Sequence, residues 1–331
     1  MIFMFTMMMS TLISISSNSW MGMWIGLEIN LLSMIPLMNN SYNWFSSESS
    51  IKYFIIQVIS SSIIMMMMIL LMKSNFPLSN YNKTLILILN SSLMMKMSVA
   101  PFHFWFPEII EGLNWNICFM MMSWQKIAPM VILNYLMINM NFLTIIIIMN
   151  ILISSISGLN QTSLRKILTY SSIAHLSWML SSMMIWEKLW IYYFIIYSYI
   201  IWNIIYMLNK FNIYYLNQLM IFMNKNLKYY LIYIVNLFSL GGLPPFIGFF
   251  PKWLTIQMLI NNNFFLQSYL LIIMSLITLF FYIRIMFSSM ILNSKEINFL
   301  KYKNLNNKII MFLNFFNISS LILMTLIFNY F

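Results

Sequence analysis

The unbroken apolar run IIMMMMILLM at residues 63–72 decides the fold class, and TIIIIM at residues 144–149 follows the same pattern. A strand of a transmembrane β-barrel would alternate apolar and polar residues, because one of its faces lines a polar lumen. These runs stay apolar at successive positions, as in helices that cross the hydrocarbon core, each of which needs about 20 apolar residues. The sequence therefore predicts membrane-spanning helices.

The composition of the whole chain indicates the same class. Of its 331 residues, 62% are hydrophobic, 18% are aromatic and only 7% are charged, whereas a soluble domain is about 45–50% apolar and about 25% charged. So few charges cannot cover a surface exposed to water, and so many aromatic residues exclude a disordered chain. We therefore expect an all-α, polytopic membrane protein.

Hydropathy divides the chain into eleven expected spans joined mostly by short connections. The spans fall near 2–17, 20–38, 51–72, 85–106, 116–137, 142–160, 165–185, 190–208, 229–250, 264–288 and 309–328. An allowance of about 30 residues for each helix and its connection leads to a similar number. The two longer polar connections, 209–228 and 293–308, are too short for an extramembrane domain, so residues 1–331 are expected to form a single membrane domain.

The formal charge of +11 comes from 17 Lys and Arg residues against six acidic residues. These cations are scattered over short loops, which is typical of topology signals rather than of a nucleic-acid-binding face. The connections after even-numbered spans carry ten cations, and those after odd-numbered spans carry three. The positive-inside rule then places the N-terminus on the cation-rich side, cytoplasm or organelle matrix, and eleven spans place the C-terminus opposite.

Four charged residues lie within hydrophobic segments: Glu28, Lys96, Lys126 and Lys252. Lys126 is about ten residues from either end of its expected span, or about 15 Å, which is too far for its side chain to reach the membrane surface. Each charge in mid-membrane costs about 2.5–3.5 kcal/mol. This cost favours a functional role, and the alternative is a structural ion pair between Glu28 and one lysine.

Proton transfer is the chemistry that these residues favour. A lysine held away from water can exchange a proton near neutral pH, and a nearby glutamate changes its proton affinity. Glu28 and Lys96 are therefore expected to form a switching pair, with Lys126 and Lys252 continuing the series. His175 follows several hydroxyl residues and suits proton relay, although a histidine hydrogen-bonded between helices is an equal alternative. The sequence contains no nucleotide-binding or HExxH motif.

Two of the lysines lie beside prolines that should interrupt their helices. Lys96 precedes Pro101, and Lys252 follows GGLPP at residues 241–245 and Pro251. Proline removes backbone hydrogen bonds, and membrane helices tolerate such breaks where these face protein or a wet cavity. Interrupted helices at corresponding places in two halves are typical of a transporter site.

The positions of these two lysines predict an internal repeat. If residues 1–140 and 141–290 are two repeats of five helices, each lysine falls in the fourth helix of its repeat. An odd number of helices per repeat inverts the second copy across the membrane. Residues 291–331 then add a connection and a C-terminal helix.

Several short motifs stand in one order along the chain. They are GLEIN at 26–30, APFHFW at 100–105, WQKIAP at 124–129, GLNQT at 158–162, LRKIL at 164–168, SLGGLPP at 239–245 and FFPKW at 249–253. Together they closely resemble the antiporter-like subunits in the membrane arm of mitochondrial NADH:ubiquinone oxidoreductase, respiratory complex I. The resemblance extends over about residues 20–285, and Ser98 stands where relatives usually have glycine.

The resemblance implies a proton-translocating core subunit of the mitochondrial inner membrane, with the cation-rich side facing the matrix. By motif, Glu28 corresponds to the paired glutamate and Lys126 to the connecting lysine of the family's proton axis. Lys96 and Lys252 correspond to the lysines of the first and second broken helices. An animal form of such a subunit has eleven helices, which is the number of spans expected here.

The resemblance also implies indirect coupling to redox chemistry elsewhere. NADH, FMN, iron–sulfur clusters and ubiquinone would belong to other subunits, so this chain is expected to bind no cofactor and no metal. The implied partners are neighbouring antiporter-like and small membrane subunits, lipids, protons and buried waters, with no nucleic acid. Two other functions remain open: a stand-alone cation/proton antiporter and a purely structural scaffold subunit.

Overall fold

The structure is a computed structural model that describes residues 1–39, 43–73, 80–136, 140–219, 227–291, 315 and 317. Within these ranges the chain forms helices and no extended strand, and a single bridge pairs Ser163 with Tyr215. The all-α prediction is therefore confirmed for the described part. The connection expected at 293–308 and nearly all of the span expected at 309–328 lie outside the described residues.

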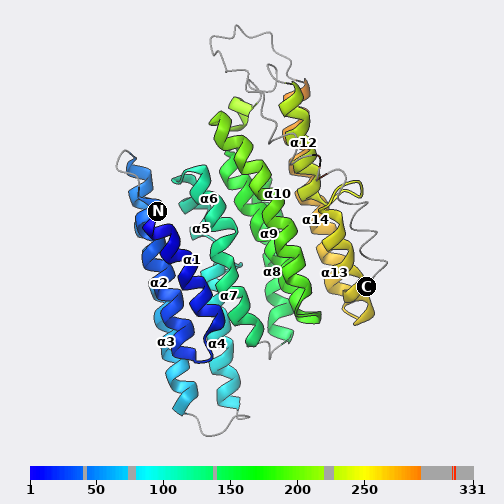
Figure 1. Cartoon of the computed structure of the whole chain (residues 1–331). Helices are drawn as coiled ribbons and strands as arrows, with labels where there is room; N and C mark the ends of the chain where they lie inside the picture. The colour runs from blue at the N-terminus through cyan, green and yellow to red at the C-terminus, as the bar shows by residue number, and fades with distance from the viewer. Residues whose placement is uncertain are drawn as a thin grey trace.

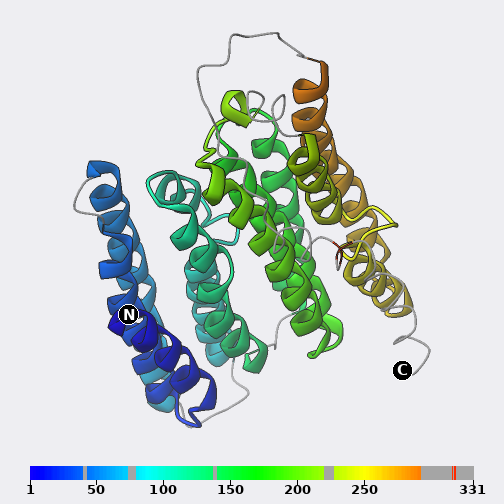
Figure 2. The same ribbon diagram turned by 45° about the horizontal axis from the view of Figure 1, so that its top comes forward.

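The helices follow the expected spans closely at the N-terminal end and depart from them at the proline-containing stretches. They are α1 (Ile2–Ser16), α2 (Trp20–Met38), α3 (Trp44–Lys73), α4 (Asn80–Met97), α5 (Trp105–Glu111), α6 (Trp115–Met122), α7 (Trp124–Tyr135), α8 (Met140–Gly158), α9 (Leu164–Ile185), α10 (Leu189–Phe211), α12 (Leu227–Gly241), α13 (Phe249–Asn261) and α14 (Phe265–Ile291). Figures 1 and 2 show them side by side, with α1–α4 at one edge, α8–α10 in the middle and α12–α14 at the other edge.

Six described segments are long and apolar enough to cross a membrane. They are Trp20–Met38, Trp44–Lys73, Trp115–Tyr135, Met140–Gly158, Leu189–Phe211 and Phe265–Phe287. The α4 and α12 helices are cut short by breaks, and α9 is long enough but rich in serine. A membrane protein with many spans is therefore confirmed, whereas the number eleven stays a prediction.

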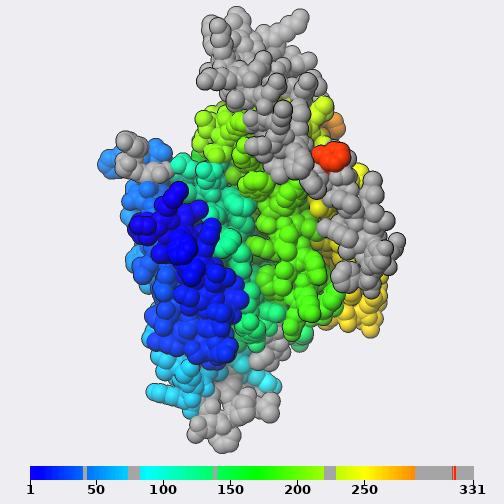
Figure 3. All heavy atoms as spheres, viewed as in Figure 1, coloured from blue at the N-terminus to red at the C-terminus, as the bar shows by residue number. Residues whose placement is uncertain are grey.

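The α9 helix occupies the centre of the bundle. Every side chain from Ser171 to Met184 is buried, and the helix packs against α5, α8, α10 and α13. Its serine hydroxyls donate to carbonyl oxygens three residues earlier, as Ser171 does to Leu168 at 2.8 Å, so they need no water. In the space-filling view of Figure 3, α1 and α10 form part of the near surface. A polar helix is thus enclosed by more apolar ones and kept away from lipid.

Candidate functional site

The first helix break begins at Ser98, two residues after Lys96. Ser98 has φ 62°, and the amides of Ser98 and Val99 donate to the carbonyls of Met95 and Met94 at 3.3 and 3.0 Å. This pair of hydrogen bonds is the Schellman ending of a helix, in which a left-handed residue, usually glycine, follows the last turn. The backbone therefore explains why glycine suits this position, and the left-handed conformation costs serine about 1–2 kcal/mol.

The second break repeats this geometry at Gly242. Its φ is 78°, its amide donates to Ser239 O at 3.2 Å, and the amide of Leu243 donates to Phe238 O at 3.3 Å. Each break therefore has one residue in the left-handed conformation, and the two hydrogen bonds have the same spacing in sequence at both breaks. The predicted interruptions of both helices are confirmed.

The two lysines lie on opposite sides of their breaks, in the order that the neighbouring prolines predict. Lys96 precedes its break in α4, whereas Lys252 follows its break in the separate helix α13. The Lys252 side chain returns to the break, because its Nζ donates to the carbonyls of Gly241 at 2.9 Å and Leu240 at 3.3 Å. Carbonyls at a helix C-terminus carry partial negative charge and stabilise a cation.

The absence of a side chain at Gly242 makes this return possible. A Cβ on Gly242 would lie 2.8 Å from Cδ and 3.0 Å from Nζ of Lys252. Gly248, at the start of α13, is equally constrained, since a Cβ there would overlap the carbonyl oxygen of Ser239. The second break therefore needs glycine both for its backbone and for the close approach of the lysine.

Lys126 also lies beside a helix irregularity, which the sequence did not indicate. Ser123 (φ −115°, ψ −75°) separates α6 from α7, and Lys126 sits in the first turn of α7. Its Nζ lies 3.4 Å from Ser172 O on α9, and 5.5 and 5.6 Å from the ring centroids of Phe106 and Tyr197. The lysine is only 2% exposed, so these rings and the carbonyl replace water around the ammonium.

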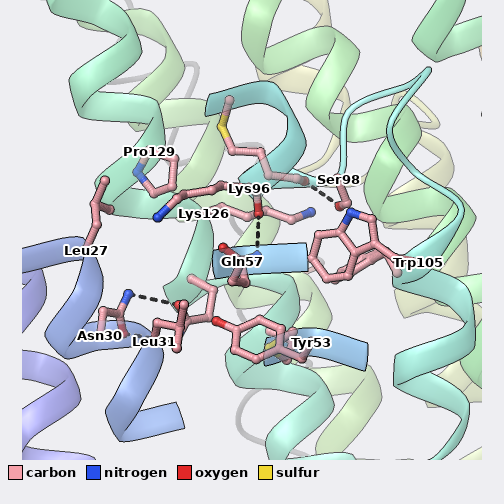
Figure 4. A pocket seen from close by; sticks show the side chains of 14 residues that line it. Leu27, Asn30, Leu31, Tyr53, Gln57, Lys96, Ser98, Trp105, Lys126 and Pro129 are labelled. Carbon is pink, nitrogen blue, oxygen red and sulfur yellow. Dashed lines mark hydrogen bonds between the residues drawn. The ribbon is translucent and has the colours of Figure 1, made fainter. Parts of the chain in front are cut away.

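Lys96 and Lys126 line one cavity of about 20 Å³, which Figure 4 shows. A cavity of this size holds about one water molecule. Asn30 and Gln125 also line it and are joined by two amide hydrogen bonds of 2.9 and 3.1 Å between α2 and α7. One water there would have polar partners on several helices. The structure thus brings together two of the lysines that the sequence singled out.

Glu28 lies near this cavity without lining it. Its neighbour Leu27 is a lining residue, and the Glu28 carboxylate attracts the Lys96 ammonium electrostatically. In the described part of the chain, ion pairs within 4.0 Å join Lys52 with Glu48 and Glu108, and Lys166 with Glu111. Glu28 and Lys96 therefore interact at a distance in this conformation, without a direct ion pair.

His175 lies on α9 between the sites of Lys126 and Lys252. Ser172, one turn before it, accepts from Lys126, and the ring of Trp178, one turn after it, lies 5.8 Å from Lys252 Nζ. Both lysine charges act on the buried imidazole. Its Nδ1 is hydrogen-bonded to the Tyr193 hydroxyl at 2.8 Å. The arrangement combines both sequence interpretations, because the histidine is hydrogen-bonded between helices and also stands between two lysines.

Two buried amides at this site were missed by the sequence reasoning. Gln57 Nε2 donates to Lys96 O at 3.4 Å, and Asn150 Oδ1 accepts from the Ala100 amide at 2.9 Å. Asn150 directly follows TIIIIM at residues 144–149, so the cost of a polar group inside an apolar span could have identified it. Within the described ranges, no group of three His, Cys, Asp or Glu residues could hold a metal ion.

Comparison with known proteins agrees with the resemblance that the sequence motifs indicate. Residues 17–281 match the family described as NADH:quinone oxidoreductase/Mrp antiporter, transmembrane. The chain is 46% identical over 307 residues to NADH-ubiquinone oxidoreductase chain 2 of Anopheles gambiae, covering 92% of this chain and 89% of the relative. It is 36% identical over 308 residues to the protein of the same name from Lemur catta, covering 92% and 89%.

A solved structure shows the same fold at lower sequence identity. A chain in the structure of respiratory complex I from Thermus thermophilus with bound Aureothin superposes with a TM-score of 0.81. The match covers 96% of this chain and 75% of that chain, at 19% identity. At this identity the likeness concerns the fold.

Proposed function

The chain belongs to the NADH:quinone oxidoreductase/Mrp antiporter family, as a relative of NADH-ubiquinone oxidoreductase chain 2, and from this premise we propose that it moves protons along its buried lysines. It is a subunit of the proton-translocating NADH:quinone oxidoreductase. NADH oxidation and ubiquinone reduction would take place in other subunits, which would also bind the cofactors. This chain would contribute the membrane-embedded transfer of protons.

The observation that supports this proposal is the series of buried lysines across the bundle. Lys96, Lys126 and Lys252 are 7%, 2% and 7% exposed, and none of them belongs to an ion pair within 4.0 Å among the described residues. Burying three cations without ion-pair partners is unfavourable for folding alone. A role in proton transfer, in which each lysine gains and loses a proton, would account for three buried lysines without ion pairs.

The geometry supports a path of two proton transfers. A water in the cavity of about 20 Å³ would connect Lys96 with Lys126. From Lys126 the proton would pass along the surroundings of His175 on α9 towards Lys252. Like charges on Lys126 and Lys252 disfavour each other in a low-dielectric interior, so loading one lysine would promote release from the other.

Glu28 would set the first step. When its carboxylate approaches Lys96 it would hold the proton on the ammonium, and when it withdraws the proton would become available to Lys126. Quinone reduction elsewhere in the complex would drive this change of distance. The electrostatic attraction without a direct ion pair fits the separated state of the switch.

We further propose eleven spans arranged as two inverted repeats, residues 1–140 and 141–290, followed by residues 291–331. The matching Schellman endings at Ser98 and Gly242 support the repeat. Support for the orientation comes from a cavity of about 490 Å³ lined by Lys52 and Arg165, two of the cations counted on one side of the membrane. The chain would then lie in the mitochondrial inner membrane, with its N-terminus in the matrix and its C-terminus facing the intermembrane space.

The proposed partners follow from this placement. The outer faces of the bundle would contact neighbouring antiporter-like subunits, small membrane subunits of the arm, and lipid. Protons and buried waters would occupy the interior.

Lys126→Met in the assembled complex tests the proposed function. Methionine keeps the length and removes the charge, so NADH:quinone turnover and proton transport per electron should both fall. NADH oxidation by a hydrophilic artificial acceptor should be unchanged. Normal transport in this variant would overturn the proposal. Cation/proton exchange by the isolated chain in liposomes would indicate a stand-alone antiporter, and silent neutral substitutions at Glu28 and all three lysines would indicate a scaffold.

A further inference from the structure

One of the backbone hydrogen bonds that the break after Lys96 removes joins Ala100 to Lys96. In a continuous α-helix the amide of Ala100 would donate to the carbonyl of Lys96, four residues earlier. In this structure each of these groups is bonded to a side chain instead. Gln57 Nε2 on α3 donates to Lys96 O at 3.4 Å, as Figure 4 shows, and Asn150 Oδ1 on α8 accepts from Ala100 N at 2.9 Å. Two amides thus satisfy both halves of the lost bond.

Asn150 also extends the connection to the next lysine. Its Nδ2 donates at 2.8 Å to the carbonyl of Ile173 on α9. The preceding residue, Ser172, provides the carbonyl that accepts from Lys126 Nζ. A single side chain, 0% exposed, therefore contacts the backbone beside the Lys96 break and the backbone beside the Lys126 acceptor.

The second break satisfies its free carbonyls differently. There the Lys252 ammonium itself donates to Leu240 O and Gly241 O. At the first break Gln57 bonds the Lys96 carbonyl, so the Lys96 ammonium need not turn back to its own helix end. The amides thus leave that ammonium to the cavity that it shares with Lys126.

We propose that Gln57 and Asn150 are positioning residues that hold the break after Lys96 open, and that Asn150 transmits movement of this break to the α9 segment that holds Lys126. This inference rests on the proposed function, in which the lysines carry protons. Both amides act on the same lost backbone bond. Removing either one leaves a buried backbone group without a partner, which changes the shape of the break.

Leucine variants of the two amides in the assembled complex test this inference. Asn150→Leu and Gln57→Leu should each lower proton transport and quinone-coupled turnover per assembled complex by about tenfold, within the range typical of coupling between sites. The double variant should lose little more than the stronger single variant, because both act on one break. NADH oxidation by a hydrophilic artificial acceptor should stay unchanged.

A matched control distinguishes the effect of Asn150 on coupling from the general effect of removing a buried polar group from α8. Ser154 lies one turn further along α8, is equally buried, and its hydroxyl donates within its own helix, to Ile151 O at 3.2 Å. Ser154→Ala should behave as the parent complex. If Asn150→Leu lowers the amount of complex but leaves turnover per complex normal, the role is merely structural and the inference is wrong.

A conservative variant keeps the test decisive if Asn150→Leu does not assemble. Asn150→Asp retains an oxygen for the Ala100 amide, and when protonated it also has an O–H for the Ile173 carbonyl. Its coupled turnover should recover at about pH 6 relative to about pH 8, beyond any change in the parent. Equal pH profiles for Asn150→Asp and the parent would overturn the inference.

The Lys126→Met complex distinguishes the two proposals. If Lys126→Met loses transport while the amide variants pump normally, only the inference fails. If Lys126→Met itself pumps normally, the proposed function fails.

Discussion

Lys126 and Lys252 reach the same helix: Nζ of Lys126 lies 3.4 Å from Ser172 O, and Nζ of Lys252 lies 5.8 Å from the ring centroid of Trp178. Ser172 and Trp178 both lie on α9, about 9 Å apart along the helix axis. His175 stands between them and is bonded to Tyr193. Residues 126 and 252, far apart in sequence, therefore share one short polar segment in the centre of the bundle.

Replacing His175 tests whether this segment transfers protons. His175→Phe keeps a ring of similar size but removes both nitrogens, so coupled proton transport should fall by about a hundredfold if the imidazole relays protons. Tyr193→Phe is the matched variant, because it removes only the hydroxyl that is bonded to Nδ1. It should have a smaller effect on transport, and equal, normal rates in both would exclude the relay. Proton uptake by complexes in liposomes provides the measurement.

Neutralising the first pair tests the switch. Lys96→Ala or Glu28→Gln should lower quinone-coupled turnover and proton transport by about tenfold or more, because the charge that drives the first step is lost. Assembly of the complex should remain intact. Glu48→Gln is the control, since the Glu48 carboxylate is exposed and paired with Lys52 at 3.1 Å, and surface pairs contribute about 0–1 kcal/mol. If assembled Lys96→Ala complexes kept normal rates and proton stoichiometry, the switch assignment would be wrong.

Alanine at two adjacent glycines tests the second break. Gly242→Ala should impair transport, because its φ of 78° disfavours a side chain and the new Cβ would press on Lys252 at 2.8 Å. Gly241→Ala is the matched control, since its Cβ would meet its nearest neighbour, Leu279, at an ordinary 3.5 Å. Turnover per assembled complex should fall in the first variant and stay near the parent value in the second. Equal tolerance of both would show that Lys252 does not depend on Gly242.

Ser98 allows the opposite experiment, a gain of stability. Ser98→Gly should stabilise the break by about 1 kcal/mol, because glycine adopts the left-handed conformation without a steric penalty. Ser98→Val should destabilise it, since a β-branched side chain fits φ 62° poorly. The midpoint of thermal inactivation of the complex measures both changes. A lower midpoint for Ser98→Gly than for the parent would contradict this account of the break.

Much of the site could be predicted because each signal is local in the sequence. The long apolar runs predict helices, and the prolines near Lys96 and Lys252 predict interruptions at the places where the structure has them. The charged residues were identified by their cost in a membrane. The small residue at 98 is also a local signal, and its φ of 62° gives it a physical meaning.

Contacts between distant helices could not be predicted in this way. Asn150 bonds Ala100, and Asn30 bonds Gln125, across pairs of helices whose relative placement no local pattern specifies. The distortion at Ser123 coincides with no proline or glycine, since Pro129 lies six residues later, inside α7. Lys252 is expected after the break, but the hydrogen bond from its Nζ back to Gly241 O depends on the turn between α12 and α13, which no local pattern specifies.

The sequence by itself determined that this chain is a helical membrane protein and which of its few charges lie where lipid would penalise them. It did so because helix formation and burial follow from composition and from neighbours within about one turn. Only the tertiary structure decided that α9 is the helix shared by Lys126, His175 and Lys252, and that two amides hold the first break. Hydrogen bonds between helices depend on how the helices pack, which is a property of the whole bundle rather than of any one segment.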